Sequence, residues 1–153
     1  MQTTAAHHTN KTAQALAKTL SEEYLLMLKT QNFHWNVEGP LFFSLHKLFE
    51  SQYKELIEFI DDTAEIIRTY NVKSPGSFRE FQKTAFIDEA PNDLISAQQM
   101  MDMLNRDHMS MSARLKEYME DAEVVGDSNA VTLYEDLITF HDKAAWMIRS
   151  HRA

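Results

Sequence analysis

The sequence predicts an all-α fold, a bundle of four long helices in which one of the three connections is long. Only three Gly and three Pro occur in 153 residues, which is too few turn residues for a typical sheet-rich domain. The chain has no Cys, and this argues against a small domain held together by disulfides and against thiol chemistry. With 44% hydrophobic residues, the chain is long enough to bury a sizeable core as one domain.

The four helices are predicted from the segments that lie between helix breakers. Apolar residues recur every three or four positions in each segment, the period of a helix with one buried face. We predict helices over residues 12–37, 41–70, 92–122 and 128–149, and the third follows a Pro suited to the first turn of a helix. Residues 1–10 are predicted to form a flexible tail and residues 11–153 the bundle. The breakers are Gly39-Pro40, Pro75-Gly76, Pro91 and Gly126.

The lengths of the connections predict the topology. The first and the last connection are short, so each joins an antiparallel hairpin, while the middle one spans about twenty residues and can cross the bundle. Within it, Phe78 and Phe81 stand among polar residues, which predicts a short amphipathic helix over residues 77–85. Four helices with one long crossover have the connectivity of ferritin-like bundles.

The charge balance favours a protein that handles cations. The 15 Lys and Arg against 23 Asp and Glu give a formal charge of −8, and such a surface repels nucleic acid unless it carries a local basic patch. The sequence has no apolar run long enough to span a membrane and no signal-peptide pattern at its start, so we expect a cytoplasmic protein.

His and carboxylate side chains are the remaining candidates for chemistry, because phosphate-binding loops and common hydrolase motifs are absent. Di-iron sites inside a single bundle use Glu three residues before His on two helices. None of the seven His has Glu at that position. The sequence therefore argues against a di-iron site within one subunit.

Two His and three carboxylates suggest a site shared between subunits. His34 and His46 flank the first short connection, and His46, Glu50, Asp61 and Glu65 fall within an arc of roughly 100° on one helix. His46 and Asp61 are nevertheless about 22 Å apart along that helix, whereas metal bonds are about 2 Å long. A two-fold copy running antiparallel would bring its own Asp61 and Glu65 to His46 and Glu50. Imidazole with carboxylate suits a redox-capable metal such as iron.

At these residues the chain resembles the Dps-like mini-ferritins. The matching segments are N-F-H-W-N-V-E-G-P-L-F at 32–42, L-H-K-L-F-E at 45–50 and D-D-T-A-E at 61–65, and the resemblance continues to H-D-K-A-A-W-M at 141–147. It implies two iron ions per site, held by His34, His46 and Glu50 of one subunit and by Asp61 and Glu65 of its two-fold mate.

The resemblance also implies a function and an assembly. Such a protein is a hollow dodecamer that oxidises Fe(II), with hydrogen peroxide preferred over oxygen, and stores the ferric product, which protects the cell against oxidative stress. Trp35 matches an electron-transfer residue that absorbs stray oxidising equivalents.

Two positions depart from the family pattern. Ile66 stands where the family usually has Arg, so an inter-subunit salt bridge is missing or is replaced by one from Arg68. Thr132 stands where an acid usually lines the negative iron-entry pore. The remaining candidates for that pore are Glu120, Asp121, Glu123 and Asp127.

Two other functions stay open. The first is a DNA-compacting structural protein with little ferroxidase activity, although residues 1–10 contain no Lys or Arg, which predicts weak or absent DNA binding. The second is a metal-free helical oligomer.

The other polar residues of the helices are assigned structural positions. We expect His108 and His141 to face each other inside the bundle as hydrogen-bonded residues without a metal. Five acids are expected on solvated or inter-subunit faces: Glu22, Glu23, Glu55, Glu58 and Asp62.

Overall fold

The computed structural model describes residues 2–152, and for residues 2–10 it describes the backbone only. This part of the chain contains five helices and no strand, so the predicted all-α class is confirmed. The helices are α1 (Gln2–Asn36), α2 (Phe42–Thr69), α3 (Phe78–Thr84), α4 (Ala97–Val124) and α5 (Ser128–Arg149). None of them is long and apolar enough to cross a membrane.

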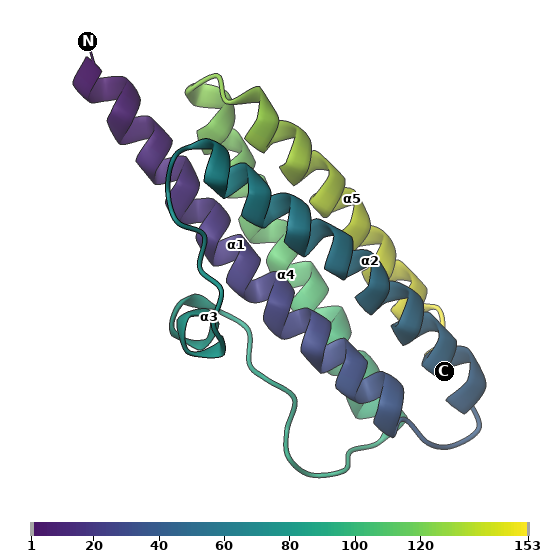
Figure 1. Ribbon diagram of the computed structural model, residues 1–153. Helices are drawn as coiled ribbons and strands as arrows, with labels where there is room; N and C mark the ends of the chain where they lie inside the picture. The colour runs from purple at the N-terminus through teal and green to yellow at the C-terminus, as the bar shows by residue number, and fades with distance from the viewer. Residues whose placement is uncertain (1, 153) are drawn as a thin grey trace.

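The four long helices form a bundle of two hairpins (Figure 1). α1 packs mainly against α2 and α4 against α5, while α1 also contacts α4 and α2 contacts α5. The segment between α2 and α4 runs along the bundle and carries α3, which packs on α1. The predicted crossover and its short helix are therefore both present.

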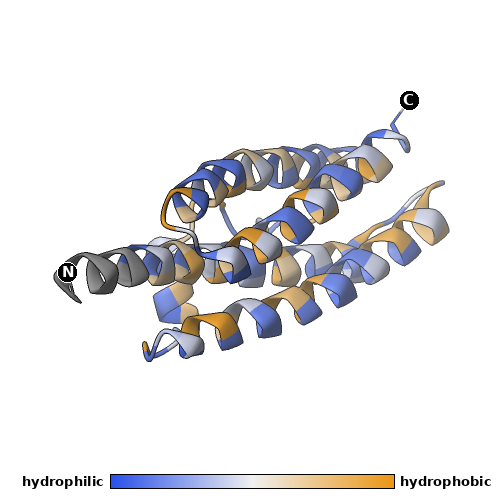
Figure 2. Cartoon of the chain, turned by 90° about the horizontal axis from the view of Figure 1, so that it is seen from above, coloured by the Kyte–Doolittle hydropathy of each residue, from blue (hydrophilic) through white to orange (hydrophobic). Residues whose placement is uncertain are grey.

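Each long helix buries an apolar face. In Figure 2 hydrophobic and hydrophilic residues alternate along the helices, as expected for amphipathic helices that share a core. One part of this core surrounds Phe33, Phe49 and Leu104. The other surrounds Leu16 and Ile67. Burial of these side chains stabilises the bundle by about 1.5–3 kcal/mol for each large residue.

The helix starts differ from the predicted ones at α1 and α4. The predicted start of α4 after Pro91 is wrong: the helix begins at Ala97, and the Ser96 hydroxyl accepts from the Gln99 N–H while the Gln99 side chain accepts from the Ser96 N–H. This capping box satisfies two N–H groups that the first turn leaves free. Leu94 consequently lies outside the helix and is exposed. α1 begins at Gln2, ahead of the predicted residue 12, and the tail predicted at 1–10 lies outside the residues whose side chains are described.

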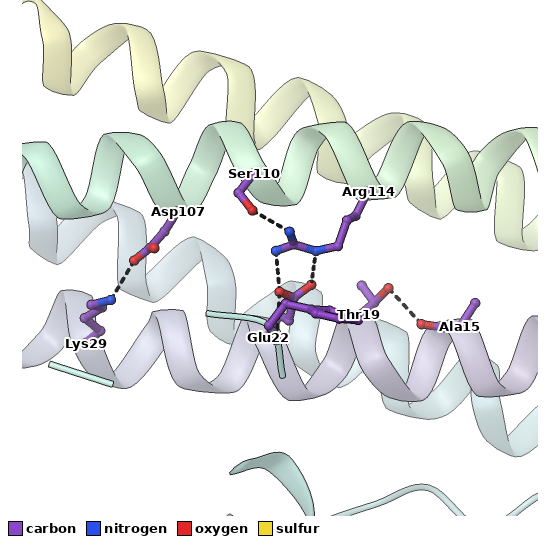
Figure 3. Close-up of polar contacts among 8 residues, drawn as sticks. Ala15, Thr19, Glu22, Lys29, Asp107, Ser110 and Arg114 are labelled. Atoms are coloured by element: carbon purple, nitrogen blue, oxygen red, sulfur yellow. Dashed lines mark hydrogen bonds and ion pairs between the residues drawn. The ribbon is translucent and has the colours of Figure 1, made fainter. Parts of the chain in front are cut away.

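Two of the five acids expected on outer faces are buried instead. Glu22 is 2% exposed and Glu23 is fully buried, whereas Glu55, Glu58 and Asp62 are exposed as predicted. The Arg114 guanidinium, on α4, donates to both Glu22 oxygens, as Figure 3 shows. Burial without such a cation raises the pKa of Glu23 well above its usual value.

A second buried ion pair ties α1 to α4 and to the crossover. The Lys29 ammonium lies 2.8 Å from the Asp107 carboxylate (Figure 3). It also donates to the Asp88 carbonyl, at 2.6 Å. Because Lys29 is only 4% exposed, this charge depends on its protein partners.

Candidate metal centre

His34 and His46 lie side by side where α1 ends and α2 begins. The short connection that contains Gly39, which has a φ of +101°, turns the chain back on itself and brings the two helix ends together. The imidazole rings stack with centroids 3.9 Å apart and planes 16° from parallel. His34 is 8% exposed and His46 is half-buried. The two His that flank the short connection therefore lie at the same end of the hairpin, as the sequence predicts.

The two His are joined by a reciprocal pair of hydrogen bonds. The Nδ1 of each ring lies 2.7 Å from the backbone carbonyl oxygen of the other residue. A carbonyl oxygen only accepts, so each Nδ1 carries the hydrogen and donates it. In the neutral imidazole, the lone pair then sits on Nε2. Both rings thus present the tautomer in which Nε2 can bind a metal.

Two further rings extend this stack. Phe42 stacks on His46 with centroids 5.0 Å apart, and Tyr53 meets His34 edge to face at 5.3 Å. The four rings form a continuous row in the order Phe42, His46, His34, Tyr53. Phe42 and Tyr53 are not among the site residues predicted from the sequence, although both share the His46 face of α2 at offsets of four and seven residues.

Glu50 follows His46 by one helical turn and is held by two cations. Its carboxylate oxygens lie 3.2 Å from the Lys47 ammonium and 2.7 Å from that of Lys54. Hydrogen bonds from Lys54 and Lys47 lower the pKa of Glu50 to about 2. The group is therefore an anion at neutral pH, which is the form that binds metals.

The other two predicted ligands lie apart from the His pair. Asp61 and Glu65 are exposed on the second half of α2, fifteen or more residues beyond His46 on a continuous helix. Among the residues whose side chains are described, no three of His, Asp or Glu gather closely enough to hold a metal ion. The candidate ligands of one chain therefore lie in two separate groups, the two His (the His half) and the two acids (the acid half).

The remaining predicted residues lie near the surface. Trp35 is 61% exposed next to His34. Arg68, predicted as a possible replacement for the Arg missing at position 66, donates to the Val72 carbonyl of its own chain at 2.6 Å.

The four candidate pore acids cluster around the α4 to α5 connection and differ in their contacts. Glu120, Asp121 and Glu123 are exposed, and Asp121 pairs with Lys11 at 3.0 Å. Asp127 caps α5 by accepting from the Ala130 N–H. It also accepts from the Tyr70 hydroxyl at 2.6 Å. Its carboxylate therefore has a structural role within the chain.

His108 and His141 form a second His pair inside the bundle. Both are fully buried, and their Nδ1 atoms are 2.8 Å apart, so the prediction that they face each other is confirmed. Burial lowers the pKa of His108 to about 3 and that of His141 well below its usual value. The pair is neutral and shares one hydrogen between the two Nδ1 atoms.

Comparison with known proteins identifies the family. The ferritin-like domain model matches residues 13–153. A Bacillus anthracis protein named DNA protection during starvation protein 2 is 34% identical over 137 residues, which cover 90% of this chain and 93% of the relative. The crystal structure of Dps from Staphylococcus aureus superposes with a TM-score of 0.90 at 30% identity, over 94% of this chain and 96% of that one. The chain belongs to the Dps-like mini-ferritins.

Two further relatives add to this family assignment. The Dps of Vibrio cholerae O1 matches with a TM-score of 0.89 at 30% identity, over 95% of this chain and 91% of that one. Its structure is described as that of a member of a broad superfamily of ferritin-like diiron-carboxylate proteins. General stress protein 20U of Bacillus subtilis is 33% identical over 141 residues, or 90% of this chain and 94% of the relative. The mini-ferritin thus has relatives named for stress and for DNA protection.

Proposed function

We propose that this mini-ferritin oxidises Fe(II) with hydrogen peroxide, which it uses in preference to oxygen, at sites shared by two subunits, and stores the ferric product. His34, His46 and Glu50 of one subunit and Asp61 and Glu65 of its two-fold mate bind two iron ions per site. The assembly is a closed dodecamer, and the activity protects the cell from oxidative damage.

The reciprocal hydrogen bonds of the His pair carry this proposal. They set the tautomer of both rings, with Nδ1 protonated and Nε2 unprotonated, and so leave the Nε2 of each ring available to a metal. Glu50 adds an anionic oxygen one turn away. Because the acid half lies at the other end of the same helix face, a second copy is needed to complete the ligand set.

The chemistry follows from holding two Fe(II) ions together. Each Fe(II) gives one electron, so two of them reduce one peroxide: the O–O bond breaks, and with two protons it yields two waters and two Fe(III). Hydroxyl radical, the product of a one-electron reduction, is not released. Carboxylates then favour the harder Fe(III).

Trp35 and the acids near the α4 to α5 connection take supporting roles in the proposal. An exposed indole beside His34 can give up an electron to an oxidant that escapes the site. Some or all of the four pore candidates attract Fe(II) toward the interior by their negative charge: Glu120, Asp121, Glu123 and Asp127.

The test is Fe(II) oxidation by the purified oligomer, with peroxide and with oxygen as separate oxidants. We expect faster oxidation with peroxide and a stoichiometry of about one peroxide per two Fe(II). His34→Ala/His46→Ala removes the activity, whereas His151→Ala, a matched change at a half-buried His outside the site, keeps it. Equal rates in all three proteins contradict the proposal and favour the metal-free helical oligomer.

A DNA-compacting role is the alternative, favoured by the relatives named for DNA protection. Phosphate-driven binding needs clustered cations, and residues 1–10 contain none. We expect no gel shift of plasmid DNA at about pH 7.5 and about 0.15 M salt. A clear shift under these conditions supports the alternative.

A further inference from the structure

We propose that Phe42 and Tyr53 are positioning residues of the iron site, and that the outer rings of the row keep the two imidazoles parallel with both Nε2 atoms available to metal. This inference rests on the proposed function and deepens it. Neither residue contributes a ligand in the set proposed above.

The hydrogen bonds alone do not fix the tilt of the two ring planes. Each Nδ1 is tied to one carbonyl oxygen, which sets the tautomer but leaves the ring free to tilt about the line through that bond. Tilting of either imidazole moves its Nε2 and separates two rings whose centroids are 3.9 Å apart. Metal binding by both Nε2 atoms depends on their relative position, so the tilt of the two rings has to be restrained.

The outer rings supply that restraint from opposite ends of the row. Phe42 stacks on His46, with ring planes 28° from parallel and centroids 5.0 Å apart. Tyr53 meets His34 at 66°, a favourable geometry for an aromatic pair. Each imidazole is thereby in contact with two other rings, which restrict its tilt.

The spacing along α2 makes the row a rigid unit. Phe42, His46 and Tyr53 stand on one continuous helix, so their relative positions are set by helix geometry. Only His34 comes from α1. Phe43, adjacent in sequence, is 72% exposed and makes no ring contact among the residues whose side chains are described, which makes it the matched control.

The test uses Co²⁺ alone, added without oxidant to the intact oligomer, because its visible absorption reports both binding and coordination geometry. We expect Phe42→Leu and Tyr53→Leu to bind Co²⁺ about tenfold more weakly than the wild type and to show altered visible absorption bands. A loss of about tenfold is at the lower end of the effect of removing a residue that supports a metal ligand. Tyr53→Phe, which keeps the ring, and Phe43→Leu behave like the wild type. Size-exclusion chromatography selects variants that assemble as the wild type does.

A second measurement needs no metal. Histidine labelled with ¹⁵N distinguishes rings protonated at Nδ1 from those protonated at Nε2, and His34→Ala and His46→Ala assign the signals. The wild type should show both rings of the pair protonated at Nδ1. The Leu variants should keep this tautomer, which the hydrogen bonds set, but show shifted or broadened ring ¹⁵N signals because the rings tilt; unchanged signals in both Leu variants overturn the positioning role. This measurement applies even to a Leu variant that forms smaller particles.

Each outcome decides the question. The positioning role is overturned if Phe42→Leu and Tyr53→Leu bind Co²⁺ with the affinity and spectrum of the wild type. It is also overturned if Tyr53→Phe loses as much Co²⁺ affinity as Tyr53→Leu, or if Phe43→Leu loses as much as Phe42→Leu. A wild type that binds Co²⁺ no better than His34→Ala/His46→Ala overturns the proposed function instead. The two failures are therefore distinguishable.

Discussion

Lys29→Met should be one of the most damaging single changes in the bundle, because it leaves the buried Asp107 carboxylate without its cation. Two unit charges 2.8 Å apart attract by about 6 kcal/mol at an effective dielectric constant of about 20. The cost of burying both charges offsets much of this, but removal of one partner leaves the other charge uncompensated, at about 3–5 kcal/mol. The Asp88 carbonyl loses its donor as well.

Urea unfolding at one fixed protein concentration measures the loss. The control is Lys11→Met, which breaks an ion pair of similar length, 3.0 Å, between side chains that are 63% and 59% exposed; it should cost less than about 1 kcal/mol. Lys29→Met/Asp107→Leu should recover most of the loss, because no buried charge is left unpaired. Equal small losses for Lys29→Met and Lys11→Met would refute the reasoning that burial sets the cost.

Two further predictions concern pH. Burial raises the pKa of Glu23 in the folded state well above its usual value, so the stability that the protonated side chain contributes is present below the unfolded pKa and is lost as pH rises through the folded pKa. Glu23→Gln cannot ionise, so its stability relative to the wild type should increase from about pH 5 to about pH 8. A difference that does not grow with pH argues against a buried acid at this position. Burial lowers the pKa of His108 from 6.5 to about 3, so the free energy of unfolding of the wild type should fall as pH drops below 6.5. In His108→Leu/His141→Leu the free energy of unfolding should fall less over the same pH range. An equal fall in both proteins contradicts the buried neutral pair.

The fold could be predicted from the sequence because helical periodicity and helix breakers act locally. The start of α4 was misassigned because Pro91 and Ser96 both suit a helix start, and the Ser96–Gln99 capping box decided between them. A Ser three residues before a Gln is a capping-box pattern that the sequence shows, so a helix start at Ala97 could have been predicted from it.

The burial of Glu22 could not be predicted, because the cation that neutralises it lies 92 residues away in the chain. The pattern of one helix shows which face a carboxylate occupies but not which partner another helix brings to it. At the site, the short connection predicted that His34 and His46 lie at the same end of the hairpin. Their ring stacking and the contributions of Phe42 and Tyr53 depend on side-chain rotamers that only packing determines.

The inter-subunit site is tested most directly by mixing two inactive variants. His34→Ala/His46→Ala lacks the His half and Asp61→Ala/Glu65→Ala lacks the acid half, so each should be inactive as a pure oligomer. In mixed oligomers formed from equal amounts, a site is intact when its His half comes from the second variant and its acid half from the first. Random assembly gives a probability of about one half for each, so about one quarter of the wild-type activity should return. Peroxide-driven Fe(II) oxidation that stays at background in oligomers shown by native mass spectrometry to be mixed would contradict a site shared between subunits.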